Sequence, residues 1–136
     1  ADDIVIDWST YNGSTVLGWY RIRGTYSDLS WDDAIDNSLL FTKGTFTTGW
    51  RLPNFAEFVS LVNYSGVRAL EYAPFNFTGN LNFWSSTTVA TSTTTAYVFQ
   101  NYTALSYVIS RIKTNTSSSY RAIPCRTFTV TGTILT

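Results

Sequence analysis

The sequence has no histidine and a single cysteine, Cys125. Without histidine, neither a Ser-His-Asp triad nor a Cys-His pair can form, and no imidazole is available to bind a metal. One cysteine excludes an internal disulfide bond and any zinc site that needs several thiolates. These absences remove the commonest hydrolase and zinc-protein chemistries from consideration.

Charge is also scarce. Nine basic and nine acidic residues cancel, and charged residues make up 13% of the chain, about half the usual share. Duplex nucleic acid and anionic membranes select for basic patches, so neither is an expected partner. The chain lacks an apolar run of about 18 residues, so no membrane insertion is expected. The carboxylates form no recognisable catalytic pair, which predicts a protein that is not an enzyme.

Aromatic residues, in contrast, are abundant at 17% of the chain, with Ser, Thr and Asn crowding the positions between them. Tyr, Trp, Ser and Asn dominate recognition surfaces because they combine rigid contact area with adaptable hydrogen bonding. Alternatively, the aromatics fill a β-rich core and Thr simply suits strands. The chain of 136 residues is 44% hydrophobic, which predicts one domain over residues 1–136.

The stretch over residues 49–57 contains the clearest local signals. Pro53 ends the extended segment that begins at Trp50, because proline has no N–H to donate. Asn54 is a good helix N-cap, and Glu57 lies three positions later, where a capping-box carboxylate reaches back. Apolar residues then repeat at helical spacing at Phe55, Phe58, Val59 and Val62. The pattern predicts a helix near residues 54–63.

A second helix is predicted near residues 30–41. Ser30 caps it, and Asp32 and Asp33 fill its first turn, where carboxylates favour the exposed amide groups. The predicted apolar stripe consists of Trp31, Ala34, Ile35 and Leu39. Because capping explains both acids, we do not assign them to catalysis or metal binding.

Alternating segments predict the strands. The first hairpin pairs residues 4–8 with 16–22 around an Asn12-Gly13 turn. Later strands are predicted at 83–87, 96–100, 105–113 and 120–126, the last two connected by a loop over residues 114–118. A terminal strand is predicted at 127–131, paired with the first strand. Two short helices plus an antiparallel sheet define an α+β domain.

Several motifs resemble a known family. Residues 29–35 are similar to its "tWeeAi" helix, and residues 49–57 resemble its "WRLPt..EL" signature. Residues 83–87 match "yWSST", residues 96–98 match "aw.v", and residues 120–126 resemble the closing "yvRcVR". The matches lie in the correct order across residues 29–126. On these motifs the chain resembles the C-terminal domain of the Legionella collagen-like protein, the DUF1566 family.

The resemblance implies a C-type lectin-like fold and an extracellular location, at a bacterial cell surface or on a phage virion, for example at a tail-fibre tip. Calcium-dependent lectins of this fold carry Glu-Pro-Asn and Trp-Asn-Asp triplets. Here residues 84–86 (Trp-Ser-Ser) stand where the second would lie, and residues 73–75 (Ala-Pro-Phe) offer no carboxylate or amide. Hard cations need such oxygens. We therefore expect no calcium-dependent sugar site, no other metal and no cofactor.

Two functions fit these expectations. The first is a non-enzymatic module for adhesion that binds a cell-surface glycan or a protein receptor. The alternative is a structural fibre or capsid subunit whose aromatic surface is buried between copies. A homo-oligomer is expected, with a trimer favoured by analogy with fibre-tip relatives.

The predicted ligand contacts combine amides, aromatic rings and cations in the loop over 75–82 and the hairpin over 102–113. They are Asn76, Asn80, Asn82, Tyr102, Tyr107, Arg111 and Lys113. The loop aromatics Phe75 and Phe77 are predicted to lie beside the amides. Arg51 is expected to pair with Glu57 or a carbonyl rather than to bind an anionic ligand.

Overall fold

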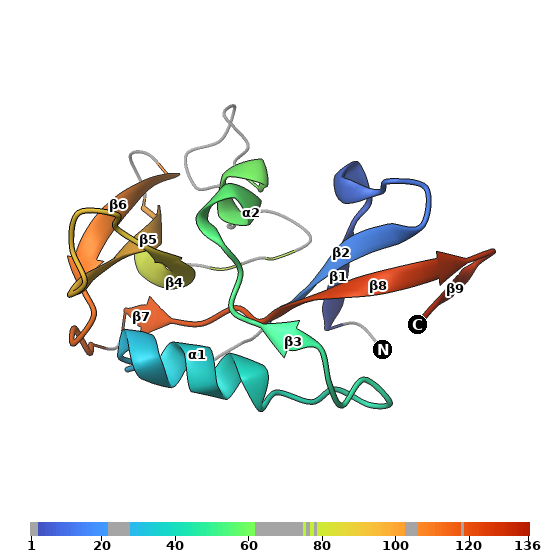
Figure 1. Cartoon of the computed structure of the whole chain (residues 1–136), viewed down its shortest axis with the longest axis horizontal. Coiled ribbons are helices and arrows are strands. Elements are labelled where there is room, and N and C mark those ends of the chain that lie inside the picture. The colour runs from blue at the N-terminus through green and yellow to red at the C-terminus, as the bar shows by residue number, and fades with distance from the viewer. Residues whose placement is uncertain are drawn as a thin grey trace.

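The computed structural model describes residues 3–21, 28–61, 75, 77, 79–102, 106–117 and 119–136 (Figure 1). The first of its two sheets contains β1 (Ile4–Asp7), β2 (Thr15–Tyr20), β8 (Cys125–Thr131), β3 (Trp50–Arg51) and β9 (Ile134–Leu135). The second contains β6 (Ser106–Ile112), β5 (Thr95–Asn101), β4 (Leu81–Thr88) and β7 (Tyr120–Arg121). With the helices α1 (Trp31–Leu39) and α2 (Phe55–Ser60), these sheets confirm the α+β class.

The first sheet brings the two ends of the chain together. β1 and β2 form the predicted antiparallel hairpin, with Ile4 opposite Tyr20. β8 then pairs with β2, with Val16 opposite Phe128. The predicted pairing of the last long strand with the first strand is therefore wrong, because β2 lies between β8 and β1.

The second sheet is antiparallel through β6, β5 and β4, whereas β7 pairs with β4 in parallel. β7 follows β6 along the chain, as predicted. It pairs with β4 rather than with β6, and Tyr120 lies opposite Asn82. The single strand predicted over 120–126 is also divided. Pro124 cannot donate to a ladder, and its carbonyl instead accepts a 2.9 Å hydrogen bond from the backbone N–H of Tyr20. At this point the chain passes from the second sheet to the first.

Both helices begin where the sequence predicts. The Ser30 hydroxyl accepts from the backbone N–H of Asp33, and Asn54 and Glu57 form a complete capping box. In α1, however, Ser38 is buried and Leu39 is 57% exposed. Ser38 lies one turn beyond the buried Ala34, and its hydroxyl donates to the Ala34 carbonyl at 2.7 Å. This bond satisfies the hydroxyl, so the face of α1 that carries Ala34 and Ser38 can be buried. Leu39 then lies on the exposed side of the helix. Along the described residues, no helix is long and apolar enough to cross a membrane.

The described residues form three hydrophobic clusters. Trp19 packs on Phe58 in the first, Trp84 on Tyr120 in the second, and Trp50 on Phe128 in the third. Trp50 and Trp84 are almost fully buried. Most aromatic side chains with a described position are thus core residues, and the few exposed rings need a separate explanation.

Candidate functional site

The junction between β3 and α2 is held by an ion pair. The guanidinium of Arg51 donates to both carboxylate oxygens of Glu57, with N–O distances of 2.8 and 2.5 Å. The same carboxylate accepts the backbone N–H of Asn54 at 2.8 Å, which completes the capping box. The predicted pairing of Arg51 with Glu57 is therefore confirmed. Both charged groups are therefore engaged in holding the first turn of α2.

The ion pair changes the acidity of its members and of the nearby thiol. Burial would raise the pKa of Glu57, but the hydrogen bonds from Arg51 and Asn54 outweigh it and lower that pKa. Hydrogen bonding to Glu57 raises the pKa of Arg51. Burial raises the pKa of the Cys125 thiol to about 12, against a partial opposing effect of Arg51. Cys125 is fully buried beside Glu57, so it is an inert core residue rather than a nucleophile.

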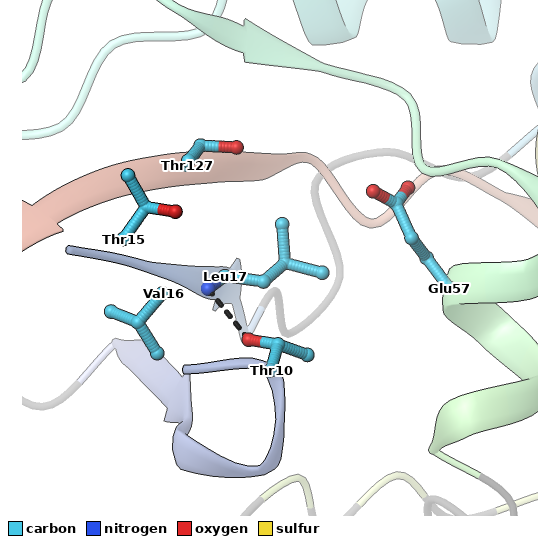
Figure 2. Close-up of a pocket in the computed structure, with 6 residues that line it drawn as sticks. All are labelled: Thr10, Thr15, Val16, Leu17, Glu57 and Thr127. Carbon is cyan, nitrogen blue, oxygen red and sulfur yellow. Dashed lines mark hydrogen bonds between the residues drawn. The ribbon is translucent and has the colours of Figure 1, made fainter. Parts of the chain in front are cut away.

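A pocket of about 270 Å³ lies between the first sheet and α2 (Figure 2). Its lining residues are Thr10, Thr15, Val16, Leu17, Glu57 and Thr127. Glu57 extends from α2 toward Leu17, while Thr15 and Thr127 lie on the neighbouring strands β2 and β8. The hydroxyls of Thr15 and Thr127 make no hydrogen bond to any residue that the structure describes. They are therefore available to a polar ligand in this pocket.

The connection between β1 and β2 forms an exposed aromatic surface, which we call the hairpin tip (residues 8–14). It starts with the 3₁₀ helix η1 (Trp8–Thr10). Trp8 is 58% exposed and Tyr11 is 45% exposed. Their ring centroids are 5.9 Å apart in an edge-to-face arrangement. Thr10, which lies between them in the sequence, also lines the pocket.

The sequence did not identify this surface as a candidate site. Trp8 continues the alternation of residues 4–7, so it was assigned to the strand. In the structure Asp7 ends the strand, because its side chain accepts the backbone N–H of Ser9 and caps η1. The signal that was available is the Asn12-Gly13 turn, which places the residues around it at the exposed end of a hairpin.

The predicted loop over 75–82 differs from expectation where it is described. Asn82 was predicted to be a loop amide, and this is wrong: it lies in β4 and is only 2% exposed. Its side chain donates to Tyr102 and Ser119 and accepts from Gln100. Phe75 and Phe77, predicted beside the ligand amides, are buried in the first cluster. The hydrophobic effect places these rings in the core rather than on an exposed surface.

The other predicted contacts have varied surroundings. Asn80 is exposed and Tyr102 is half-buried. The ammonium of Lys113 lies 4.0 Å from the ring centroid of Trp31, and Arg111 donates to the carbonyl of Ser110. Asn76 and the side chain of Tyr107 lie outside the described residues. For the exposed members of this set, ligand contact stays a prediction.

The described side chains contain no group of three or more His, Cys, Asp and Glu residues placed to hold a metal ion. What they define is an α+β domain with a two-sheet scaffold, an aromatic tip and a small pocket lined by both polar and apolar side chains. The chain belongs to the Lcl C-terminal domain family, whose profile matches residues 9–125. This confirms the resemblance drawn from the motifs. No match was found among curated proteins or among solved structures.

Proposed function

We propose that this domain is a non-enzymatic, calcium-independent module that binds a glycan or a protein receptor at the exterior of a bacterial cell or a phage virion. Membership of the Lcl C-terminal domain family supports a surface-associated module. The observation that carries the binding role is the exposure of Trp8 and Tyr11 in a molecule that buries most of its described aromatic rings. Exposing large rings loses hydrophobic stabilisation, so exposed pairs are typical of contact surfaces.

We also propose that the fold is C-type lectin-like, as the resemblance implies. Its support is the topology: β1 and β8 share one sheet, while β4, β5 and β6 form the other. This arrangement brings the two ends of the chain to one part of the molecule (Figure 1).

Binding by the purified domain to an array of glycans, with and without EDTA, tests the proposed function. We expect that EDTA leaves binding unchanged, because the sequence has neither the Glu-Pro-Asn nor the Trp-Asn-Asp triplet of calcium-dependent lectins. Binding to intact bacterial cells, measured in parallel, covers a protein receptor. Absence of binding in both assays, or loss of binding with EDTA, would contradict the proposal.

We further propose that the domain forms a homo-oligomer, with a trimer favoured. Four exposed aliphatic side chains support association: Leu39, Leu40, Ile112 and Ile134, with exposed fractions between 54% and 81%. Burial of such side chains between copies is favourable. Light scattering at high concentration tests this, and a mass of only 15.3 kDa would refute it. An obligate oligomer that also buries the hairpin tip and binds nothing would favour the structural-subunit alternative.

A further inference from the structure

The hairpin tip is held rigidly before any ligand arrives. The Thr10 hydroxyl donates to the Asp7 carbonyl at 2.7 Å and accepts the backbone N–H of Leu17 at 2.8 Å. The backbone N–H of Tyr11 donates to the Trp8 carbonyl at 3.2 Å. These bonds fix the backbone that carries both rings. A preorganised surface loses little conformational entropy when it binds, which favours recognition of a small ligand.

Asn12 adds hydrogen-bond donors beside the rings. Its Oδ1 accepts the backbone N–H groups of Ser14 and Thr15 at 3.1 and 2.9 Å. A backbone N–H can only donate, so the atom that it faces is the amide oxygen and the opposite atom is Nδ2. Nδ2 makes no hydrogen bond to a described residue. The exposed turn therefore presents two unused donors next to Tyr11.

The charge around the tip restricts the kind of ligand. Between Asp7 and Arg21 the sequence contains no charged residue. The pocket next to the tip contains one charged group, the Glu57 carboxylate, which is already paired with Arg51. An anionic ligand would lie near carboxylates, and these residues include no unpaired cation. The free energy that the ligand loses on leaving water would therefore not be recovered by an ion pair. The tip fits a neutral ligand.

A sugar ring has the chemistry that these groups recognise. One face of a pyranose carries C–H groups that pack on an aromatic ring, and its edge carries hydroxyls that pair with amides and other hydroxyls. Trp8 and Tyr11 supply the rings, Asn12 supplies donors, and Thr15 and Thr127 supply hydroxyls in the pocket. At about 270 Å³, the pocket lies just below the range of about 300–1,000 Å³ for drug-sized ligands. It therefore suits one sugar unit rather than a whole oligosaccharide.

We propose that the hairpin tip and the adjoining pocket bind one pyranose unit of a neutral glycan. This inference rests on the proposed binding function and assigns it a site and a ligand class. It places the main contacts at Trp8, Tyr11 and Asn12, in the connection between β1 and β2. The hairpin over 102–113, with its predicted contacts, belongs to the other sheet.

The test uses the whole chain on an array that carries neutral, sialylated and sulfated glycans. We expect binding to neutral glycans. Trp8→Ala and Tyr11→Ala should each weaken that binding at least about tenfold, as truncation of an aromatic contact in an interface often does. Trp8→Tyr, which keeps a ring, should retain most of it. Asn12→Asp should also weaken binding while preserving the turn, because the carboxylate keeps the acceptor oxygen and replaces the two N–H donors with a negatively charged oxygen.

Phe55→Ala is the matched control. Phe55 is an exposed aromatic residue on α2, 37% exposed, whose ring packs against Tyr97 at 5.2 Å. Its replacement should leave neutral-glycan binding unchanged. A second control is Lys113→Ala, in the turn that follows β6. If Lys113→Ala abolishes binding while the Trp8 and Tyr11 variants bind normally, the site is wrong but the proposed function stands.

Other outcomes distinguish an error in the proposed ligand class from an error in the proposed site. Binding to sulfated or sialylated glycans alone, or to a protein on bacterial cells but to no glycan, would overturn the neutral-sugar proposal while leaving the binding function intact. If Trp8→Ala dissociates an oligomer, measured by light scattering, the tip is a contact between copies and the proposal fails. No binding to any glycan or cell would remove both proposals together.

Fluorescence gives an independent readout of the site. Trp19, Trp50 and Trp84 are at most 1% exposed and Trp31 is partly buried beneath Lys113, whereas Trp8 is 58% exposed. Titration with a neutral glycan that binds on the array should shift the emission to shorter wavelength as Trp8 leaves water. The shift should disappear in Trp8→Phe while glycan binding persists. An undiminished shift in Trp8→Phe would show that the sugar lies elsewhere.

Discussion

Arg51 and Glu57 meet at the start of α2, where two guanidinium N–H groups donate to the two oxygens of one carboxylate. Arg51 comes from β3, which pairs with β8 of the first sheet, and Glu57 comes from the first turn of the helix. The pair therefore ties the sheet to α2. The side chains of Arg51 and Glu57 are 39% and 19% exposed. The pair is therefore intermediate between exposed ion pairs, which contribute little to stability, and buried ion pairs, which are costly to break.

We expect Glu57→Ala to lower the free energy of unfolding by about 1–3 kcal/mol, because it leaves a partly buried guanidinium unpaired and removes one capping bond. Chemical denaturation measures this. The control is Lys43→Ala, which breaks the more exposed pair between Lys43 and Asp3 and should have a much smaller effect. A double-mutant cycle with Arg51→Met and Glu57→Gln should give a favourable coupling energy. Additive effects would show that the pair contributes nothing.

The lowered pKa of Glu57 predicts how stability depends on pH. Its folded pKa lies below the ordinary value of 4.5, so the folded state binds this proton less readily than the unfolded chain. The stabilisation is fully present above pH 4.5 and is lost as the pH falls through the lower folded pKa. Thermal unfolding of the wild type and of Glu57→Gln should therefore converge at acidic pH. A difference in melting temperature that stays constant down to pH 2 would be evidence against this assignment.

Cys125 should be unreactive in the folded protein. With its pKa raised to about 12 and its side chain fully buried, almost no accessible thiolate exists at pH 8. A disulfide reagent such as DTNB should react completely in guanidinium chloride and only at the rate of unfolding in buffer. Thr15→Cys, a partly exposed position in the pocket, supplies a reactive control. Rapid labelling of native wild-type protein would show that the thiol is accessible.

Gly18 is required for the close contact between β2 and its neighbours. A Cβ atom at this position would lie 2.4 Å from Cε2 of Phe128 and 3.1 Å from Cδ1 of Ile6. Gly18→Ala should lower the free energy of unfolding by about 1–3 kcal/mol, as overpacking of a core does. Phe128→Leu should relieve part of this cost, so the double variant should be more stable than the sum of the single effects predicts. An additive double variant would mean that the contact adjusts elsewhere.

Local chemistry made the helices predictable, because their caps depend on residues within one turn of each other. Ser30, Asn54 and Glu57 form the predicted bonds. Strand pairing was less predictable, since nothing in the alternation of residues 127–131 distinguishes β1 from β2 as a partner. Pro124 indicates a break in the strand predicted over 120–126. Because the residues around it are apolar, the segment was nevertheless predicted as one strand rather than as two strands in different sheets. The hairpin tip was not predicted for a similar reason. Trp8 fits the alternation of the first strand, and the strand ends before it because Asp7 caps η1.

Asn82, predicted as a loop amide in contact with ligand, is instead buried in β4, so its replacement should destabilise the fold. The side chain connects three residues from β5 and the segments next to β5 and β7: Gln100 at 2.7 Å, Ser119 at 3.1 Å and Tyr102 at 3.3 Å. Asn82→Ala should lower the free energy of unfolding by about 1–3 kcal/mol, because it leaves the buried Gln100 amide without its acceptor. Thr93→Ala, at an exposed position in the turn between β4 and β5, should change it by less than about 0.5 kcal/mol. Denaturant titration compares the two. If the Asn82 variant is as stable as the Thr93 variant, water or a rearranged Gln100 replaces the lost bonds. In that case the amide at position 82 again becomes a candidate for ligand contact rather than a structural residue.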